Sequence, residues 1–197
     1  MADSAEKARL LISLLAAEEA PRSEAVRRLA ARFGPLIFLS EPLPFAYTDY
    51  YQPEMGAPLT RRLAAFLELV EPERLSVLKG ICLSLESDLA VGGKRRVNID
   101  PGLLSAHSLV LATTKNSPHR ICLAPGRYAE VTLIFQNGEF KALPWTYPDY
   151  AGKEVQDILH DLRRRYLWQL KEDKAAAQDR KPPGDARQKN SKEEPLA

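Results

Sequence analysis

Side chains that could bind an anion and move a proton gather between residues 94 and 150. Arg96, Asn98 and Asp100 alternate along a short apolar run, and a strand there would place all three on one face. Arginine makes a two-pronged contact with phosphate or carboxylate, and Asn98 would orient such a ligand. We therefore predict that Arg96 and Asn98 contact an anion. The alternative for Arg96 and its basic neighbours is a structural role at the end of a helix dipole.

A second polar cluster follows in a stretch that separates two hydrophobic runs. Lys115 and Arg120 would neutralise the anion, and His119 would donate or accept a proton, because histidine changes its charge near neutral pH. Loops on a rigid scaffold often carry such groups. The competing interpretation is a strand-end histidine that hydrogen-bonds only to backbone. The two clusters form one site if the sheet brings these ends together.

Carboxylates and aromatic residues complete the predicted site. Glu130 lies on the mixed face of an alternating run, where it pairs with an arginine across the sheet or serves as a general base or metal ligand. Together with Asp100, it is expected to orient the basic groups. Tyr147 and Asp149 belong to an aromatic-Asp loop similar to residues 47–51, and such loops cover a core edge or stack a ligand. The catalytic candidates are His119, Glu130 and Asp100, and the ligand-binding candidates are Arg96, Asn98, Lys115, Arg120, Tyr147 and Asp149.

Several common motifs are missing from the sequence. Gly92-Gly93-Lys94 lacks the earlier glycine and the following Ser or Thr of a phosphate-binding loop. In Thr114-Lys115-Asn116-Ser117, a serine replaces the aspartate that a guanine-reading loop needs. The histidines have no metal-ligand spacing, and no motif indicates a serine or cysteine nucleophile. We therefore expect no metal site, and the sequence names no cofactor.

Composition indicates a soluble globular protein of ordinary type, with 45% hydrophobic and 27% charged residues. The net charge of +2 makes nucleic acid a secondary prospect as a partner. Cys82 and Cys122 each lie in an apolar run, which favours burial. With no basic leader and no apolar run long enough to span a bilayer, we expect a cytoplasmic protein without membrane contact.

Alternating strand and helix patterns must position these side chains. The predicted strands are 10–15, 36–39, 61–69, 96–99, 119–123, 127–136 and 139–143, and the predicted helices are 23–33, 72–91, 105–112 and 153–170. The order strand, helix, two strands, helix, strand is typical of the ferredoxin-like split βαβ core. We predict an α+β fold with that core, followed by an added helix, an antiparallel meander and a C-terminal helix. Residues 1–170 would form one domain and 171–197 a disordered charged tail.

The chain also resembles a bacterial family known as domain of unknown function number 4416. The resemblance covers residues 8–168 and rests on ordered pieces that include Phe45–Tyr51, Lys94–Gly102, Leu109–Asn116, Tyr128–Leu133 and Trp145–Tyr150. It implies no activity, cofactor or catalytic residue. Some relatives carry a GTP-binding label, which the motifs above do not support.

Two functional hypotheses follow from the sequence. The first is a cytoplasmic protein that binds a phosphate- or carboxylate-bearing small molecule in a basic and polar pocket, with or without turning it over. The second is a non-enzymatic interaction module that docks a protein or RNA partner through its aromatic-Asp loops. Convergence of the basic groups in one concave pocket favours the first, and dispersal over a flat surface favours the second.

Overall fold

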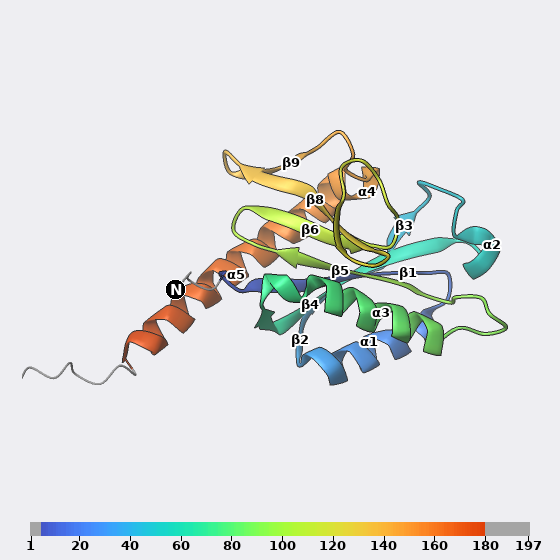
Figure 1. The fold of residues 1–197 in the computed structure, drawn as a ribbon, viewed down its shortest axis with the longest axis horizontal. Coiled ribbons are helices and arrows are strands. Elements are labelled where there is room, and N and C mark those ends of the chain that lie inside the picture. Colours follow the sequence, from blue (N-terminus) through green and yellow to red (C-terminus); the bar gives the residue numbers. More distant parts are fainter. Residues whose placement is uncertain (1–4, 180–197) are drawn as a thin grey trace, which may run out of the picture.

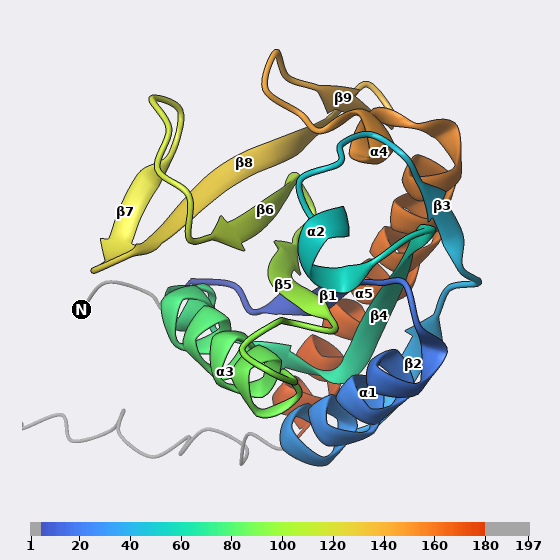
Figure 2. The ribbon, with the colours of Figure 1, turned by 90° about the vertical axis from the view of Figure 1, so that its right-hand side faces the viewer.

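The computed structural model describes residues 5–179, which form a mixed α/β structure around one antiparallel sheet (Figures 1 and 2). The sheet has nine strands in the order β2-β4-β1-β5-β6-β8-β7, with β3 beside β4 and β9 beside β8. The strands are β1 (Ala8–Ala16), β2 (Leu36–Leu39), β3 (Leu43–Phe45), β4 (Leu59–Val70), β5 (Asn98–Leu104), β6 (Ser108–Thr113), β7 (Ile121–Ala124), β8 (Arg127–Gln136) and β9 (Glu139–Ala142). The helices are α1 (Glu19–Phe33), α2 (Gln52–Met55), the 3-10 turn η1 (Pro72–Arg74), α3 (Leu75–Asp88), α4 (Pro148–Ala151) and α5 (Lys153–Asp179). The predicted α+β class is confirmed.

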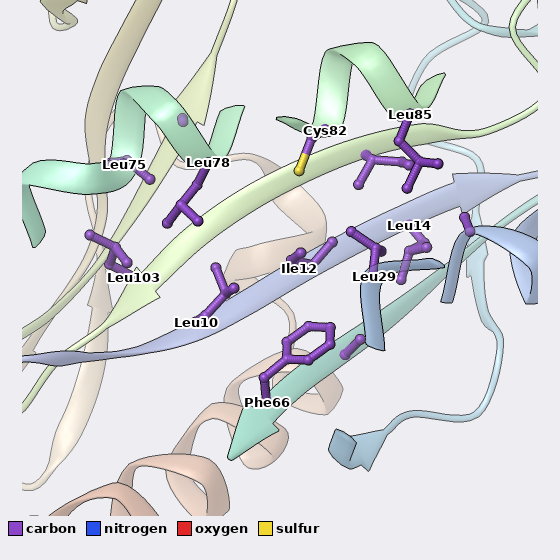
Figure 3. Packing of buried hydrophobic residues seen from close by; sticks show 14 of the residues in the cluster. Leu10, Ile12, Leu14, Leu29, Phe66, Leu75, Leu78, Cys82, Leu85 and Leu103 are labelled. Carbon is purple, nitrogen blue, oxygen red and sulfur yellow. The ribbon is translucent and has the colours of Figure 1, made fainter. Parts of the chain in front are cut away.

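Strand β1 is the buried centre of the sheet, and both of its faces are covered. Leu10, Ile12 and Leu14 point toward α1 and α3, where Leu29, Leu78 and Cys82 complete one core layer (Figure 3). Leu11 points to the other face and packs in the layer that α5 covers. Coverage of both faces explains why Leu10–Leu15 is apolar at every position except Ser13, without the polar alternation of a strand that has one exposed face.

The first helix begins earlier than the sequence predicted. Helix α1 starts at Glu19 rather than at Ser23, and Ser23 Oγ donates to Glu19 Oε1 at 2.9 Å instead of capping the helix. Pro21 lies in the first turn, where its missing N–H removes no hydrogen bond within the helix. Proline in the first turn therefore allows the helix to begin at Glu19 instead of residue 23, where the sequence analysis placed its start.

The predicted helix at 105–112 was wrong, because this segment forms a tight turn and strand β6. Ser105 Oγ accepts the N–H groups of His107 and Ser108, so it stabilises the turn between β5 and β6 rather than a helix start. Along β6, Leu109 and Leu111 face one core layer while Val110 faces the other. That alternation is the pattern of a strand buried on both faces.

The C-terminal half follows the predicted meander and helix with one correction at each. The Asn137-Gly138 hairpin joins β8 to β9, and both residues have the positive φ angles (52° and 86°) that such a two-residue turn requires. Cys122 is exposed on the edge strand β7, so the prediction of its burial was wrong, whereas Cys82 is buried as predicted. Helix α5 runs to Asp179, so residues 171–179 of the predicted disordered tail are helical, and 180–197 lie outside the described residues.

None of the helices within residues 5–179 is both long enough and apolar enough to cross a membrane.

Candidate functional site

A cavity of about 510 Å³ opens beside the sheet, between the loop of residues 47–51 and the side of α3. Residues of α3, β5, β6, β8 and α4 also line it, and these elements can be followed in Figures 1 and 2. Its polar lining consists chiefly of Arg61, Lys79, Glu86, Arg95, Asn98, Asp100, Lys115, Glu130 and Asp149. Its aromatic lining is Phe45, Tyr47, Tyr50, Tyr51, Tyr147 and Tyr150. The size suits a small-molecule ligand.

On the side of α3, the cavity wall is a buried network of paired charges. Lys79 Nζ donates to Asp100 Oδ1 at 2.7 Å and to the carbonyl of Ile99 at 3.0 Å, and it lies 3.8 Å from Glu86 Oε1. The side chains of Lys79 and Glu86 are each only 3% exposed. Burial alone would lower the pKa of Lys79, but the two carboxylates raise it above its usual value. Lys79 therefore stays protonated and neutralised by its neighbours.

The two predicted residues of β5 lie together on this wall. Asn98 Nδ2 donates to Asp100 Oδ2 at 2.6 Å, so both oxygens of Asp100 have a partner. Burial would raise the pKa of Asp100, but Lys79, Asn98 and Arg61 outweigh it and hold the pKa below the usual range. Asp100 is thus an ionised hydrogen-bond acceptor at the cavity wall, with its side chain 27% exposed.

Two arginines that the sequence analysis did not select also line the cavity, and both are paired. Arg95 Nη2 lies 2.7 Å from Glu54 Oε2, and Arg95 Nη1 donates to Asn98 Oδ1 at 2.9 Å. Arg61 Nε lies 2.6 Å from Asp149 Oδ2, an ion pair whose alignment falls short of a hydrogen bond. The carboxylate of Asp149, a predicted ligand-binding residue, is therefore buried against Arg61 and already paired with it.

Lys115 differs from the other cations around the cavity. Its Nζ lies 3.6 Å from the centre of the Tyr50 ring and 5.5 Å from that of Tyr51. Within the part of the chain that the structure describes, it is the one cavity-lining cation that forms no ion pair with a carboxylate. Desolvation by its surroundings lowers the pKa of Lys115, against an opposing effect of Asp100. Its ammonium group therefore rests against aromatic rings rather than against a carboxylate.

Glu130 on β8 lies at the centre of a second charged cluster beside the cavity. Its side chain is 1% exposed, and its Oε2 accepts from Arg120 Nε at 2.6 Å and lies 3.2 Å from His119 Nε2. Arg120 Nη2 donates to the hydroxyl of Tyr147 at 2.7 Å. The His119 ring stacks on Trp145 with 5.0 Å between ring centres. The prediction that Glu130 pairs with an arginine across the sheet is therefore confirmed.

The predicted residues thus occupy three kinds of place. Asn98, Asp100, Lys115, Glu130, Tyr147 and Asp149 line the cavity. His119 and Arg120 do not line it themselves, but both contact Glu130, which does. Arg96 lies away from the cavity, because strand β5 begins only at Asn98 and Arg96 pairs with Glu18 at 2.6 Å.

Arg61, Lys79, Glu86 and Arg95 were the site residues that the sequence analysis missed. Lys79 and Glu86 carried a usable signal, because they lie seven positions apart on the otherwise apolar inner side of α3. Charged residues at such positions are rarely buried unless they pair with each other or with a third group. Arg61 and Arg95 carried no comparable signal, since each reaches its partners across long sequence separations or from a turn.

Among residues 5–179, no group of three or more His, Cys, Asp and Glu side chains is placed to bind a metal ion. The side chains that line the cavity supply cations, carboxylates and the hydroxyls of tyrosine and threonine, and His119 contacts one of the carboxylates.

Comparison with known proteins gives one match. The family model described as Domain of unknown function (DUF4416) matches residues 6–166, which is most of the chain. No curated protein and no solved structure matches the sequence. Because the match spans far more than half of the chain, the protein belongs to the DUF4416 family of unknown function, which is the family that its sequence motifs resemble.

Proposed function

We propose that the cavity binds a small molecule that carries a phosphate or carboxylate group, and that Lys115 is the cation that receives this group. One observation carries the proposal. Lys115 is the cavity-lining cation without a carboxylate partner among residues 5–179, whereas Lys79, Arg61 and Arg95 are already neutralised. A ligand anion at Lys115 would replace only a contact with an aromatic ring.

Tyrosine hydroxyls that line the same cavity as Lys115 would complete the contact with the anion. Tyr147 accepts a hydrogen bond from Arg120, so its own O–H is free to donate. Burial raises the pKa of both Tyr51 and Tyr147, so both phenols keep their protons at physiological pH. A cation beside two neutral O–H donors is a favourable setting for the oxygens of a phosphate or carboxylate.

In this proposal the carboxylates of the site act as positioning groups. Asp100 fixes Lys79 and Asn98, and Glu130 fixes Arg120 and His119. Arg96 has no part in it, since it pairs with Glu18 outside the cavity. The gathering of these polar groups around one hollow supports ligand binding over the alternative of a flat docking surface for a protein or RNA.

The binding proposal is tested with purified full-length protein. Native mass spectrometry first looks for a retained ligand, and thermal-shift and calorimetric titrations then use inorganic phosphate, phosphosugars and dicarboxylates. We expect an anion whose affinity falls about 10- to 100-fold in Lys115→Met, the value of one charge-assisted contact. Lys115→Arg should retain most of the affinity. Lys171→Met, which removes an exposed lysine of α5, is the matched control and should have no effect. An anion that binds equally well to wild type and to Lys115→Met would overturn the proposal, as would failure of every anion to bind.

The first part of the chain supports a finer interpretation of the fold, a ferredoxin-like core. The elements β1, α1, β2, β4, α3 and β5 follow the strand and helix order of that fold. Their strands pair antiparallel in the order β2-β4-β1-β5, and α1 and α3 pack on the same face. In this interpretation, β6 to β9 extend the sheet beyond the core, and the cavity lies where the core meets the extension.

A further inference from the structure

Three side chains beside the cavity form a continuous hydrogen-bonded chain. Ser117 Oγ lies 3.1 Å from His119 Nδ1, and His119 Nε2 lies 3.2 Å from Glu130 Oε2. Ser117 and His119 come from the loop between β6 and β7, whereas Glu130 comes from the middle of β8. A hydroxyl, an imidazole and a buried carboxylate are thus connected in series by tertiary folding.

The positions of the protons in this chain follow from the partners of Glu130. Arg120 Nε donates to Glu130 Oε2 at 2.6 Å, so this carboxylate oxygen acts as an acceptor. His119 Nε2 must then carry the proton of the 3.2 Å contact. In the neutral imidazole Nδ1 is left with a free lone pair, so the hydroxyl of Ser117 donates to it. This is the tautomer that a general base for Ser117 requires.

The imidazole is also held in place and remains reachable. Its ring stacks on Trp145 with an angle of 10° between the ring planes. The indole N–H of Trp145 donates to the carbonyl of Val131 on β8, which anchors the stacking partner to the same strand as Glu130. The His119 side chain is 22% exposed and Ser117 is half-buried, so a reagent from solvent can approach the pair.

We propose that Ser117 is a nucleophile that accepts an acyl group from an ester, with His119 as its general base and Glu130 as a positioning residue. Ser117 Oγ forms a bond to the acyl carbon while its proton passes to His119 Nδ1. The bond from the acyl carbon to the leaving oxygen breaks, and that oxygen takes the proton from His119. Water then attacks the acyl-serine by the same route and releases the acid.

The arrangement uses the two ring nitrogens in the opposite sense to the Ser-His-Asp template, where the serine contacts Nε2. The chemistry is equivalent, because both nitrogens belong to one conjugated ring and either can accept the proton. The proposal goes beyond ligand binding in the cavity, and its tests measure a covalent bond rather than an affinity. Either proposal can therefore fail alone.

Labelling of the full-length protein with an alkyl fluorophosphonate tests the nucleophile. The serine oxygen replaces fluoride on phosphorus, and peptide mass spectrometry locates the adduct. We expect one adduct, on Ser117, that disappears in Ser117→Ala and forms about 100-fold more slowly in His119→Gln, the usual contribution of a general base. Ser84→Ala removes an exposed serine of α3 and should label like wild type. Absence of an adduct on folded wild type, or a labelling rate that His119→Gln leaves unchanged, overturns the proposal.

Nitrogen NMR of the imidazole rings tests the positioning role of Glu130 separately. The chain has three histidines, and His119→Gln identifies the signals of His119. We expect a neutral ring protonated at Nε2 in wild type and a mixture of tautomers in Glu130→Gln. A wild-type ring protonated at Nδ1 would leave Ser117 without a base and overturn the mechanism.

Discussion

The two lysines of the cavity, Lys79 and Lys115, differ in how their charge is neutralised. Lys79 lies on α3, is 3% exposed and has two carboxylates within 4 Å. Lys115 lies in the loop after β6, is exposed at the cavity and rests on the ring of Tyr50. The two lysines thus have the same functional group in two different environments. A buried lysine must be paired to be tolerated, whereas an exposed lysine in a loop can keep its charge for a partner.

Lys79 belongs to a charge network that stabilises the fold, whereas Lys115 is the residue proposed to bind the ligand. Glu86 joins Lys79 to the start of β5, because its Oε1 also accepts the N–H of Ile99 at 2.6 Å. Burial raises the pKa of Glu86, and Lys79 opposes that effect. The wall of α3 is therefore a set of charges that depend on one another, and a ligand that took one of them would leave the others unpaired.

Removal of Lys79 should have the largest effect on stability. Lys79→Met leaves Asp100 and Glu86 facing each other at a buried wall without their cation. We expect a loss of about 3–5 kcal/mol in the free energy of unfolding, the usual result of breaking a buried charge pair. Urea denaturation followed by circular dichroism measures it. Lys115→Met is the matched control, and we expect a change below about 1 kcal/mol.

A double variant sharpens this comparison. In Lys79→Met with Asp100→Asn, the carboxylate that lost its partner is also removed, so part of the stability should return. Residues in direct contact usually show an interaction energy of about 0.5–3 kcal/mol in such a cycle. Equal losses in Lys79→Met and Lys115→Met would contradict the division of the cavity into a structural and a binding wall.

The next effect in size concerns the second charged cluster, where Glu130 depends on Arg120. Arg120→Ala removes the stronger partner of a carboxylate that is 1% exposed and leaves it with His119 and Thr132. Because these partners remain, we expect a loss of about 1–3 kcal/mol on thermal or chemical unfolding. Arg96→Ala breaks an exposed pair with Glu18 and should cost at most about 1 kcal/mol. A larger effect at Arg96 than at Arg120 would contradict the burial argument.

Strand alternation predicted part of this site from sequence and also caused one error. Asn98 and Asp100 lie on the same side of β5 as the alternation requires, and Glu130 on β8 reaches Arg120, which directly precedes the neighbouring strand β7. Arg96 was assigned to the same face by the same strand alternation. Alternation holds only within the strand, and residue 96 precedes the first residue of β5. Arg95 reaches Asn98 instead, from a turn whose course the sequence does not indicate.

The sequence could not predict contacts that depend on how distant elements pack. Arg61 meets Asp149 only because β4 and α4 lie beside each other, and Lys115 meets Tyr50 only because two loops converge. Local signals were more reliable where one short pattern fixed the geometry, as at the Asn137-Gly138 turn. At residues 105–112 the local pattern indicated a helix, but β6 pairs with β5 and β8 and forms a strand instead.

The two lysines should titrate on opposite sides of the ordinary lysine value of about 10.4. Nearby carboxylates raise the pKa of Lys79 despite its burial, and desolvation lowers the pKa of Lys115. Stability from Lys79 is therefore fully present below about pH 10.4 and is lost as the pH rises through its folded value. Lys115 has the opposite sign, since stability increases as the pH rises through its lowered folded value. Carbon NMR of the Cε groups, assigned with Lys79→Met and Lys115→Met, measures both midpoints. A Lys115 midpoint above that of Lys79 would contradict the comparison.

The smallest effect concerns the contact that holds Lys115 in the free protein. An exposed lysine against a tyrosine ring contributes about 0.5–1 kcal/mol, so a double-mutant cycle of Tyr50→Leu and Lys115→Met should give a coupling of that size. Tyr50→Phe keeps the aromatic face and should retain the coupling, which separates the ring from its hydroxyl. This weak contact is what a ligand anion has to replace. Tyr50→Leu should therefore leave anion affinity unchanged or slightly increase it. An affinity that falls as far as in Lys115→Met would show instead that Tyr50 contacts the ligand directly, and would contradict the role of its ring as the partner of Lys115 in the free protein.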